Sequence, residues 1–240
     1  MIRLAFVMLA GLGFATPLDN PPKFEPTEAY ETRPLEGWTI VVNKKLLAEQ
    51  PELADRTLTL LRFQLYQVAR RLPEPAVKSL QGIKIWVEEN EPHHPCMAYH
   101  PSDGWLRDHG MNPDKARCVE IANSRNFLKW TFDQPWMVLH ELAHGYHDQV
   151  LEKGFGNPEV KLAYDQAMKT GRYQSVLRSS GKSEKAYAAT NPMEYFAEAT
   201  EAFFGTNDFY PFLRAELNQH DADMAALLAR LWGTRLDRRP

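Results

Sequence analysis

The decisive stretch of this sequence is Trp136-Met137-Val138-Leu139-His140-Glu141-Leu142-Ala143-His144-Gly145-Tyr146-His147. Pro135 precedes it and suits the first turn of a helix. On a helix, His140 and His144 lie on one face, about 6 Å apart along the axis, so both imidazoles can bind one cation. Glu141 then lies beside that cation, where a base can accept a proton from bound water. The stretch therefore predicts a zinc site on a helix over residues 135–151.

An H-E-x-x-H pattern supplies two metal ligands, so a third must come from elsewhere. The metzincin pattern would place a histidine at position 150, which is Val150 here. A carboxylate is available in the stretch Asn191-Pro192-Met193-Glu194-Tyr195-Phe196-Ala197-Glu198, whose first two residues are suited to cap and begin a helix. Glu194 and Glu198 alone would be typical of an exposed helix face. Beside H-E-x-x-H they predict that one of the two is the third ligand and that the other is a hydrogen-bond partner of a ligand histidine.

The segment Glu194-Tyr195-Phe196-Ala197-Glu198 resembles the E-F-F-A-E segment in the catalytic domain of anthrax lethal factor and its relatives, a gluzincin-like group of zinc peptidases. In that family the first glutamate is the third zinc ligand, and a tyrosine seven residues earlier stabilises the oxyanion. The resemblance implies these roles for Glu194 and Tyr187, and it leaves Glu198 as the expected hydrogen-bond partner of a ligand histidine. It covers residues 136–148 and 186–204. The large N-terminal domains of lethal factor have no counterpart here, so small exported relatives fit better and the toxin's partners and substrates are not implied.

These residues predict a secreted zinc-dependent peptidase, most simply a metalloendopeptidase, with one catalytic Zn²⁺ on His140, His144 and Glu194. We expect it to hydrolyse a peptide or protein through a zinc-activated water, with Glu141 as general base and Tyr187 as donor to the oxyanion. The alternative is a catalytically silent zinc-binding or partner-recognition protein on the same scaffold. Glu141 and Tyr187 favour the enzyme, because zinc binding requires neither. A structural zinc domain would need four protein ligands and no base.

The order of predicted elements indicates an α+β fold, a zincin-like metallopeptidase domain with a small N-terminal mixed sheet and a mainly helical C-terminal part. Short β-branched or alternating runs predict strands at 38–42, 83–87 and 118–122. An apolar stripe over residues 58–68 predicts a helix that Pro73 and Pro75 end. Later helices, which carry the metal ligands, are expected near 135–151, 157–170, 192–204 and 221–232. We expect one catalytic domain over 37–240, after a Pro-rich lead-in over 16–36.

The first fifteen residues are typical of an export signal. Arg3 precedes an apolar run over 4–12, and Gly13-Phe14-Ala15 offers small residues where a signal peptidase cleaves. The run is shorter than the roughly 20 residues that span a bilayer. Position 12 is Leu12, so the cysteine of a bacterial lipoprotein is absent. With a buried N-terminal helix as the alternative, we expect a signal peptide at 1–15, no membrane span, and a secreted, periplasmic or cell-envelope location.

Charge and cysteine content narrow the class further. The formal net charge is −3, which gives no indication of binding to nucleic acid or to an anionic membrane. The two cysteines, Cys96 and Cys118, lie in a loop-rich stretch before the metal motif. In an exported protein such a pair predicts a disulfide, with two buried thiols as the alternative.

Four further histidines lie before the metal-binding helix, and one more lies on it. Residues 90–117 are rich in proline and glycine, which predicts a long irregular loop, and they include His93, His94, His100 and His109. Their spacing favours surface positions over a second metal site. On the metal-binding helix, His147 is expected at the substrate side or at the surface. Asp148 is either a hydrogen-bond partner near the metal or a surface residue.

Overall fold

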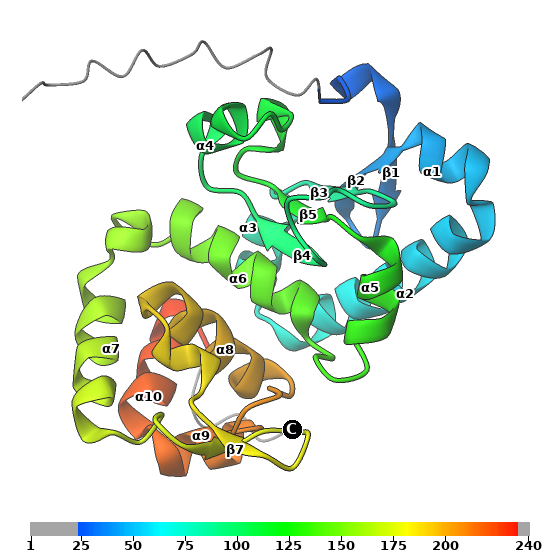
Figure 1. Ribbon diagram of the computed structural model, residues 1–240. Coiled ribbons are helices and arrows are strands. Elements are labelled where there is room, and N and C mark those ends of the chain that lie inside the picture. The colour runs from blue at the N-terminus through cyan, green and yellow to red at the C-terminus, as the bar shows by residue number, and fades with distance from the viewer. Residues whose placement is uncertain (1–23, 235–240) are drawn as a thin grey trace, which may run out of the picture.

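The computed structural model describes residues 24–234, and the expected signal peptide at 1–15 lies outside these residues. It is α+β, with a small mixed sheet in the N-terminal half and helices in most of the remainder, which confirms the coarse fold prediction (Figure 1). Over residues 24–234, no helix has both the length and the apolar composition that a membrane crossing requires. The N-terminal part of the lead-in, residues 16–23, also lies outside the described range.

The sheet has the strand order β1-β2-β3-β5-β4. Its strands are β1 (Tyr30–Leu35), β2 (Trp38–Asn43), β3 (Ile85–Val87), β4 (Met97–Tyr99) and β5 (Val119–Ile121). β2, β3 and β5 are parallel, whereas the edge strands β1 and β4 run antiparallel to their neighbours. The sheet begins at Tyr30, before the expected start at Trp38. β1 tolerates Pro34 because an edge strand pairs on one side only.

Helices cover the sheet and connect its strands. They are η1 (Thr27–Ala29), α1 (Lys44–Glu49), α2 (Pro51–Arg71), α3 (Glu74–Gln81), α4 (Asp103–Asp108), η2 (Pro113–Lys115) and α5 (Ser124–Trp130). Along α2, the buried residues Leu61, Leu65 and Val68 recur at three- and four-residue spacing, which gives the helix one core-facing side. Pro75 lies within the first turn of α3, where proline is tolerated, so the second expected helix stop is instead part of a helix start.

The C-terminal half is mainly helical. It contains α6 (Met137–Gln149), η3 (Gly154–Gly156), α7 (Pro158–Thr170), β6 (Val176–Leu177), β7 (Ser183–Glu184), η4 (Tyr187–Ala189), α8 (Pro192–Phe204), α9 (Arg214–His220) and α10 (Ala222–Leu231). The four helices expected here are all present near their predicted bounds. The short helix α9 and the β6–β7 hairpin were not expected.

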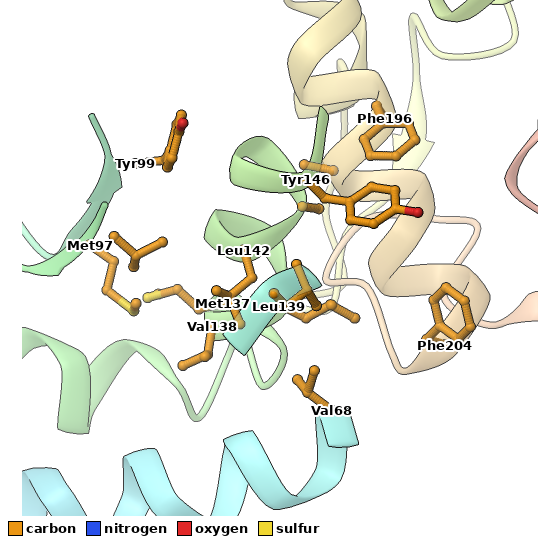
Figure 2. Close-up of a cluster of buried hydrophobic side chains, with 14 of the residues drawn as sticks. Val68, Met97, Tyr99, Met137, Val138, Leu139, Leu142, Tyr146, Phe196 and Phe204 are labelled. Carbon is orange, nitrogen blue, oxygen red and sulfur yellow. The ribbon is translucent and has the colours of Figure 1, made fainter. Parts of the chain in front are cut away.

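Helix α6 lies between the sheet and the C-terminal helices (Figure 1). Figure 2 shows its apolar side chains in one cluster with Met97 and Tyr99 of β4 and with Phe196 and Phe204 of α8. Gly145 allows this close packing, because a Cβ atom there would lie 2.6 Å from Ile83 Cδ1 and 3.2 Å from Tyr99 Cε2. The core therefore sets the position of the helix that carries the H-E-x-x-H motif.

Two expectations for residues 90–118 are wrong. The first is a long irregular loop, since the segment contains strand β4 and helices α4 and η2. Ser102 begins α4 by accepting a hydrogen bond from the backbone of Trp105, and Asn112 caps η2 in the same way. The prolines and glycines lie mainly between these short elements or at their ends. The composition of the segment therefore gave no indication of the elements.

The second is the disulfide, because Cys96 and Cys118 are both free thiols. In the antiparallel register of β4 and β5, Met97 pairs with Ile121, so Cys96 lies at one end of the pair. Cys118 lies at the other end, where its carbonyl accepts a hydrogen bond from the backbone of His100. Cys96 also packs in the main core, whereas Cys118 packs with Trp86 on the opposite sheet face. A bridge between them is therefore geometrically excluded.

Candidate metal centre

The two histidines of the motif lie on the face of α6 that borders a cleft. The residues around them, Leu139, Leu142 and Ala143, are completely buried, which keeps this part of the helix in place. His140 and His144 each leave about a tenth of the side chain exposed, and their ring centroids are 4.8 Å apart. The predicted helical spacing therefore brings both rings to one point.

Helix α8 brings a carboxylate to the same point. The side chain of Asn191 accepts hydrogen bonds of 2.9 Å from the backbone N–H groups of Met193 and Glu194, and Pro192 begins the helix. Glu194 thus lies in the first turn. Its Oε2 is 3.0 Å from His140 Nε2 and 3.3 Å from His144 Nε2.

These three side chains form a set of possible metal ligands, one atom from each lying within 4.8 Å of the others. Burial raises the pKa of Glu194, but hydrogen bonds with His140 and His144 outweigh it and hold that pKa far below its usual value. An ionised carboxylate and two imidazole nitrogens are the donor set of many catalytic zinc sites. The residues therefore fit a zinc ion.

Glu141 is held by the edge of the sheet. Its Oε2 accepts a hydrogen bond of 2.8 Å from the backbone N–H of Tyr99 in β4. Because β4 pairs only with β5, one side of this strand is free of sheet partners and faces α6. Glu141 lines the cleft next to both histidines, in the position expected of a base.

Tyr187 borders the same cleft from the opposite half of the molecule. It lies in η4, directly before α8, and its ring centroid is 6.3 Å from that of His140. The residue is 48% exposed and lines the cleft, so its side chain is accessible to a bound molecule. The structure thus brings together all five residues expected for zinc binding and catalysis: His140, Glu141, His144, Tyr187 and Glu194.

The cleft has a volume of about 620 Å³. β4 contributes Met97, Ala98 and Tyr99, while Arg178 and Phe209 come from the β6–β7 hairpin and the loop after α8. Arg178 donates hydrogen bonds to Asp208 and Glu184, so its charge is compensated within this part of the cleft. The cleft is large enough for a few residues of an extended peptide.

The Nδ1 atom of His140 has a partner that the sequence reasoning missed. Glu201 Oε1 lies 2.7 Å from it, whereas Glu198 Oε1 lies 3.9 Å away. Both carboxyl groups are almost completely buried, and burial raises the pKa of each. The signal was present in the sequence, because residues seven apart lie on the same helix face and Glu201 is seven residues after Glu194.

His147 is completely buried, so the expectation of a substrate-side or surface position is wrong. Its ring lies 5.2 Å from that of Phe155 and 4.9 Å from that of Phe196. Burial, with a smaller contribution from His144, lowers its pKa to about 4. Asp148 is also structural, since its carboxylate accepts a hydrogen bond of 2.7 Å from the Tyr99 hydroxyl and thereby joins α6 to β4.

The histidines of residues 90–117 fall into different environments. His93 and His109 are exposed, as expected, but His100 is buried and contacts Glu120 at 2.7 Å. Glu120 and Glu88 both pair with the buried Lys115. These three side chains and His100 form a buried charged network. His94 lines the cleft. Over residues 24–234, none of these four histidines belongs to a group that could hold a metal ion.

Comparisons with known proteins add little to this geometry. No family model matches the chain, and no match is found among curated proteins. Among solved structures, the chain is similar to the Pro-Pro endopeptidase of Paenibacillus alvei, with 18% sequence identity and a TM-score of 0.41. The match covers 76% of this chain and 90% of that chain. A likeness this distant carries no argument, so the lethal factor resemblance stays a prediction and function rests on the site itself.

Proposed function

We propose that this protein is a zinc-dependent peptidase, most simply an endopeptidase. The observation that carries the proposal is the convergence of His140 Nε2, His144 Nε2 and Glu194 Oε2 in a cleft that also holds Glu141. Bound zinc would supply an activated water and polarise the carbonyl of the peptide bond. Three protein ligands leave room for that water, as in catalytic rather than structural zinc sites.

Glu141 is the general base in this proposal. Its carboxylate takes the proton of the attacking water and then passes it to the leaving amine. The hydrogen bond from Tyr99 N–H occupies Oε2 and leaves Oε1 to accept the proton. The backbone of β4 thereby sets the direction in which the base faces the cleft.

Tyr187 is the proposed donor to the oxyanion. Its half-exposed side chain lines the cleft, and its place in η4, directly before α8, brings its ring to 6.3 Å from that of His140. A hydrogen bond that forms only as negative charge develops on the carbonyl oxygen lowers the barrier of the chemical step. The extended substrate would be a peptide or protein, and secretion after removal of residues 1–15 remains part of the proposal.

The alternative function is a silent zinc-binding protein on the same scaffold. The experiment that separates the two is zinc analysis together with cleavage of a peptide library, for the wild type, Glu141→Gln and Glu152→Gln. Glu152 is an exposed glutamate shortly after α6 and serves as the matched control.

We expect bound zinc in all three proteins and cleavage in all but Glu141→Gln. Zinc without cleavage in the wild type would identify the silent protein. Absence of zinc from the wild type would refute both functions. Cleavage that persists in Glu141→Gln would contradict the role of Glu141 as general base but not the proposed peptidase function.

A further inference from the structure

Helix α8 directs three glutamates towards a single imidazole. Glu194, Glu198 and Glu201 lie at positions i, i+4 and i+7 of the helix, and all three approach His140. Glu194 faces Nε2, whereas Glu198 and Glu201 face Nδ1. The structure thus offers two carboxylates for one N–H, and the contacts distinguish them.

Glu201 makes the direct contact. Its Oε1 is 2.7 Å from His140 Nδ1, which is the distance of a strong charge-assisted hydrogen bond. When Nδ1 carries the proton and donates it to Glu201, the lone pair of Nε2 is available to a metal ion. This contact also sets the rotation of the ring about its χ angles.

Glu198 is held by a different partner. Its Oε2 accepts a hydrogen bond of 3.1 Å from the side-chain amide of Asn207, which follows α8. Its Oε1 remains 3.9 Å from His140 Nδ1, beyond hydrogen-bond distance. Glu198, one turn closer to Glu194, is thus engaged by Asn207 and does not reach the imidazole.

The two ligand histidines also differ from each other. His144 Nδ1 is buried and, over residues 24–234, has no hydrogen-bond partner. Its ring is confined by packing, with Phe155 at 6.4 Å between ring centroids. The orientation of His140 by a carboxylate is thus a specific feature of that ligand.

We propose that Glu201, and not Glu198, is the positioning residue of His140. The assignment rests on the proposed zinc site. Glu201 acts through the Nδ1–H group of His140 and contacts neither the substrate nor the reacting atoms. Loss of such a partner typically weakens metal affinity by about 10- to 100-fold.

The test compares Glu201→Gln, Glu198→Gln and the control Glu152→Gln in the full-length protein. Glutamine preserves side-chain size, so each buried variant should retain the fold, which thermal unfolding checks. Zinc affinity is measured by competition with a chelating dye. We expect the dissociation constant to rise by about 10-fold or more for Glu201→Gln and by less than about 3-fold for Glu198→Gln. An equal or larger loss in Glu198→Gln, or no loss in Glu201→Gln, would overturn the assignment.

A second measurement does not depend on zinc or on cleavage. In the metal-free protein, the proton on His140 Nδ1 should give a low-field, slowly exchanging NMR signal because it is buried and hydrogen-bonded. The signal should disappear or move strongly in Glu201→Gln and persist in Glu198→Gln. The reverse pattern would refute the role of Glu201 even if the wild type cleaved peptides. If the wild type bound no zinc, the proposed function would fail while this signal still decided which carboxylate holds His140.

Discussion

The backbone N–H of Tyr99 donates a 2.8 Å hydrogen bond to the carboxylate of Glu141. The proposed base is therefore joined to the edge strand of the sheet as well as to its own helix. A backbone donor cannot be lost by rotation of a side chain, so the position of the Glu141 carboxylate depends on the distance between β4 and α6. Side-chain length at position 141 is then critical.

Shortening this side chain tests that dependence. Glu141→Asp withdraws the carboxylate by one methylene, so it cannot both accept from Tyr99 N–H and reach the attacking water. We expect kcat to fall by about 100-fold or more, with zinc content unchanged. Glu152→Asp, an equivalent change at an exposed position, should leave kcat unaffected. Activity within a few-fold of the wild type in Glu141→Asp would show that the contact does not position the base.

Removal of the Tyr187 hydroxyl should affect the chemical step selectively. In Tyr187→Phe we expect kcat to fall by about 100-fold, with little change in KM, because the proposed hydrogen bond forms only in the transition state. Zinc affinity and thermal stability should be unaltered, since the side chain is 48% exposed. Tyr66→Phe, at another exposed tyrosine on α2, is the control. A rise in KM with constant kcat would instead indicate a contact made with bound substrate.

Removal of the Lys115 charge from the buried charged network should reduce the stability of the fold strongly. Lys115 is 2% exposed and pairs with Glu88 and Glu120, so Lys115→Met removes the buried cation that both of these buried carboxylates share. We expect the free energy of unfolding to fall by about 3–5 kcal/mol, measured by urea denaturation. Lys78→Met removes the exposed pair with Glu74 and should leave stability unchanged. Equal losses in the two variants would show that burial of Lys115 is energetically unimportant.

Burial of His147 predicts a dependence of stability on pH. The folded protein binds a proton at His147 only near pH 4, whereas an unfolded histidine does so near pH 6.5. As the pH falls between these values the unfolded state gains the proton first, so folding is progressively destabilised. This contribution is fully present above about pH 6.5, and its loss amounts to about 3 kcal/mol by pH 4.

Urea denaturation of the wild type and His147→Leu across pH 7 to 4 measures this contribution. The difference in unfolding free energy between the two proteins should change in favour of the variant as the pH falls. His109→Leu, at an exposed position, should follow the wild type throughout. A constant difference between wild type and His147→Leu would mean that His147 is not held in its neutral form.

Sequence reasoning succeeded where local rules determine the structure. Asn191 and Pro192 marked the start of α8 because capping depends on neighbouring residues only. The helical period likewise predicted that His140 and His144 share a face. The resemblance to lethal factor led us to expect Tyr187 and Glu194 beside them, although no comparison tests the roles assigned to these residues.

The missed features depend on long-range packing. The proline content of residues 16–36 predicted a lead-in before the fold, yet an edge strand accommodates Pro34 because a partner lies on one side only. Cys96 and Cys118 are close in sequence, but strand register places them at opposite ends of β4–β5. Glu198 accepts a hydrogen bond from Asn207, whose position follows from the chain path after α8. None of these relationships is encoded by residue spacing alone.

The ligands proposed for zinc lie on two helices, and His140 and Glu194 are 54 positions apart in the sequence. A bound ion would therefore close a loop that contains α7 and the β6–β7 hairpin, in the manner of a removable cross-link. Chelation would release that loop without altering any covalent bond. Limited proteolysis of the chain should then cut first between α6 and α8, and the pattern of fragments would report metal occupancy without a substrate.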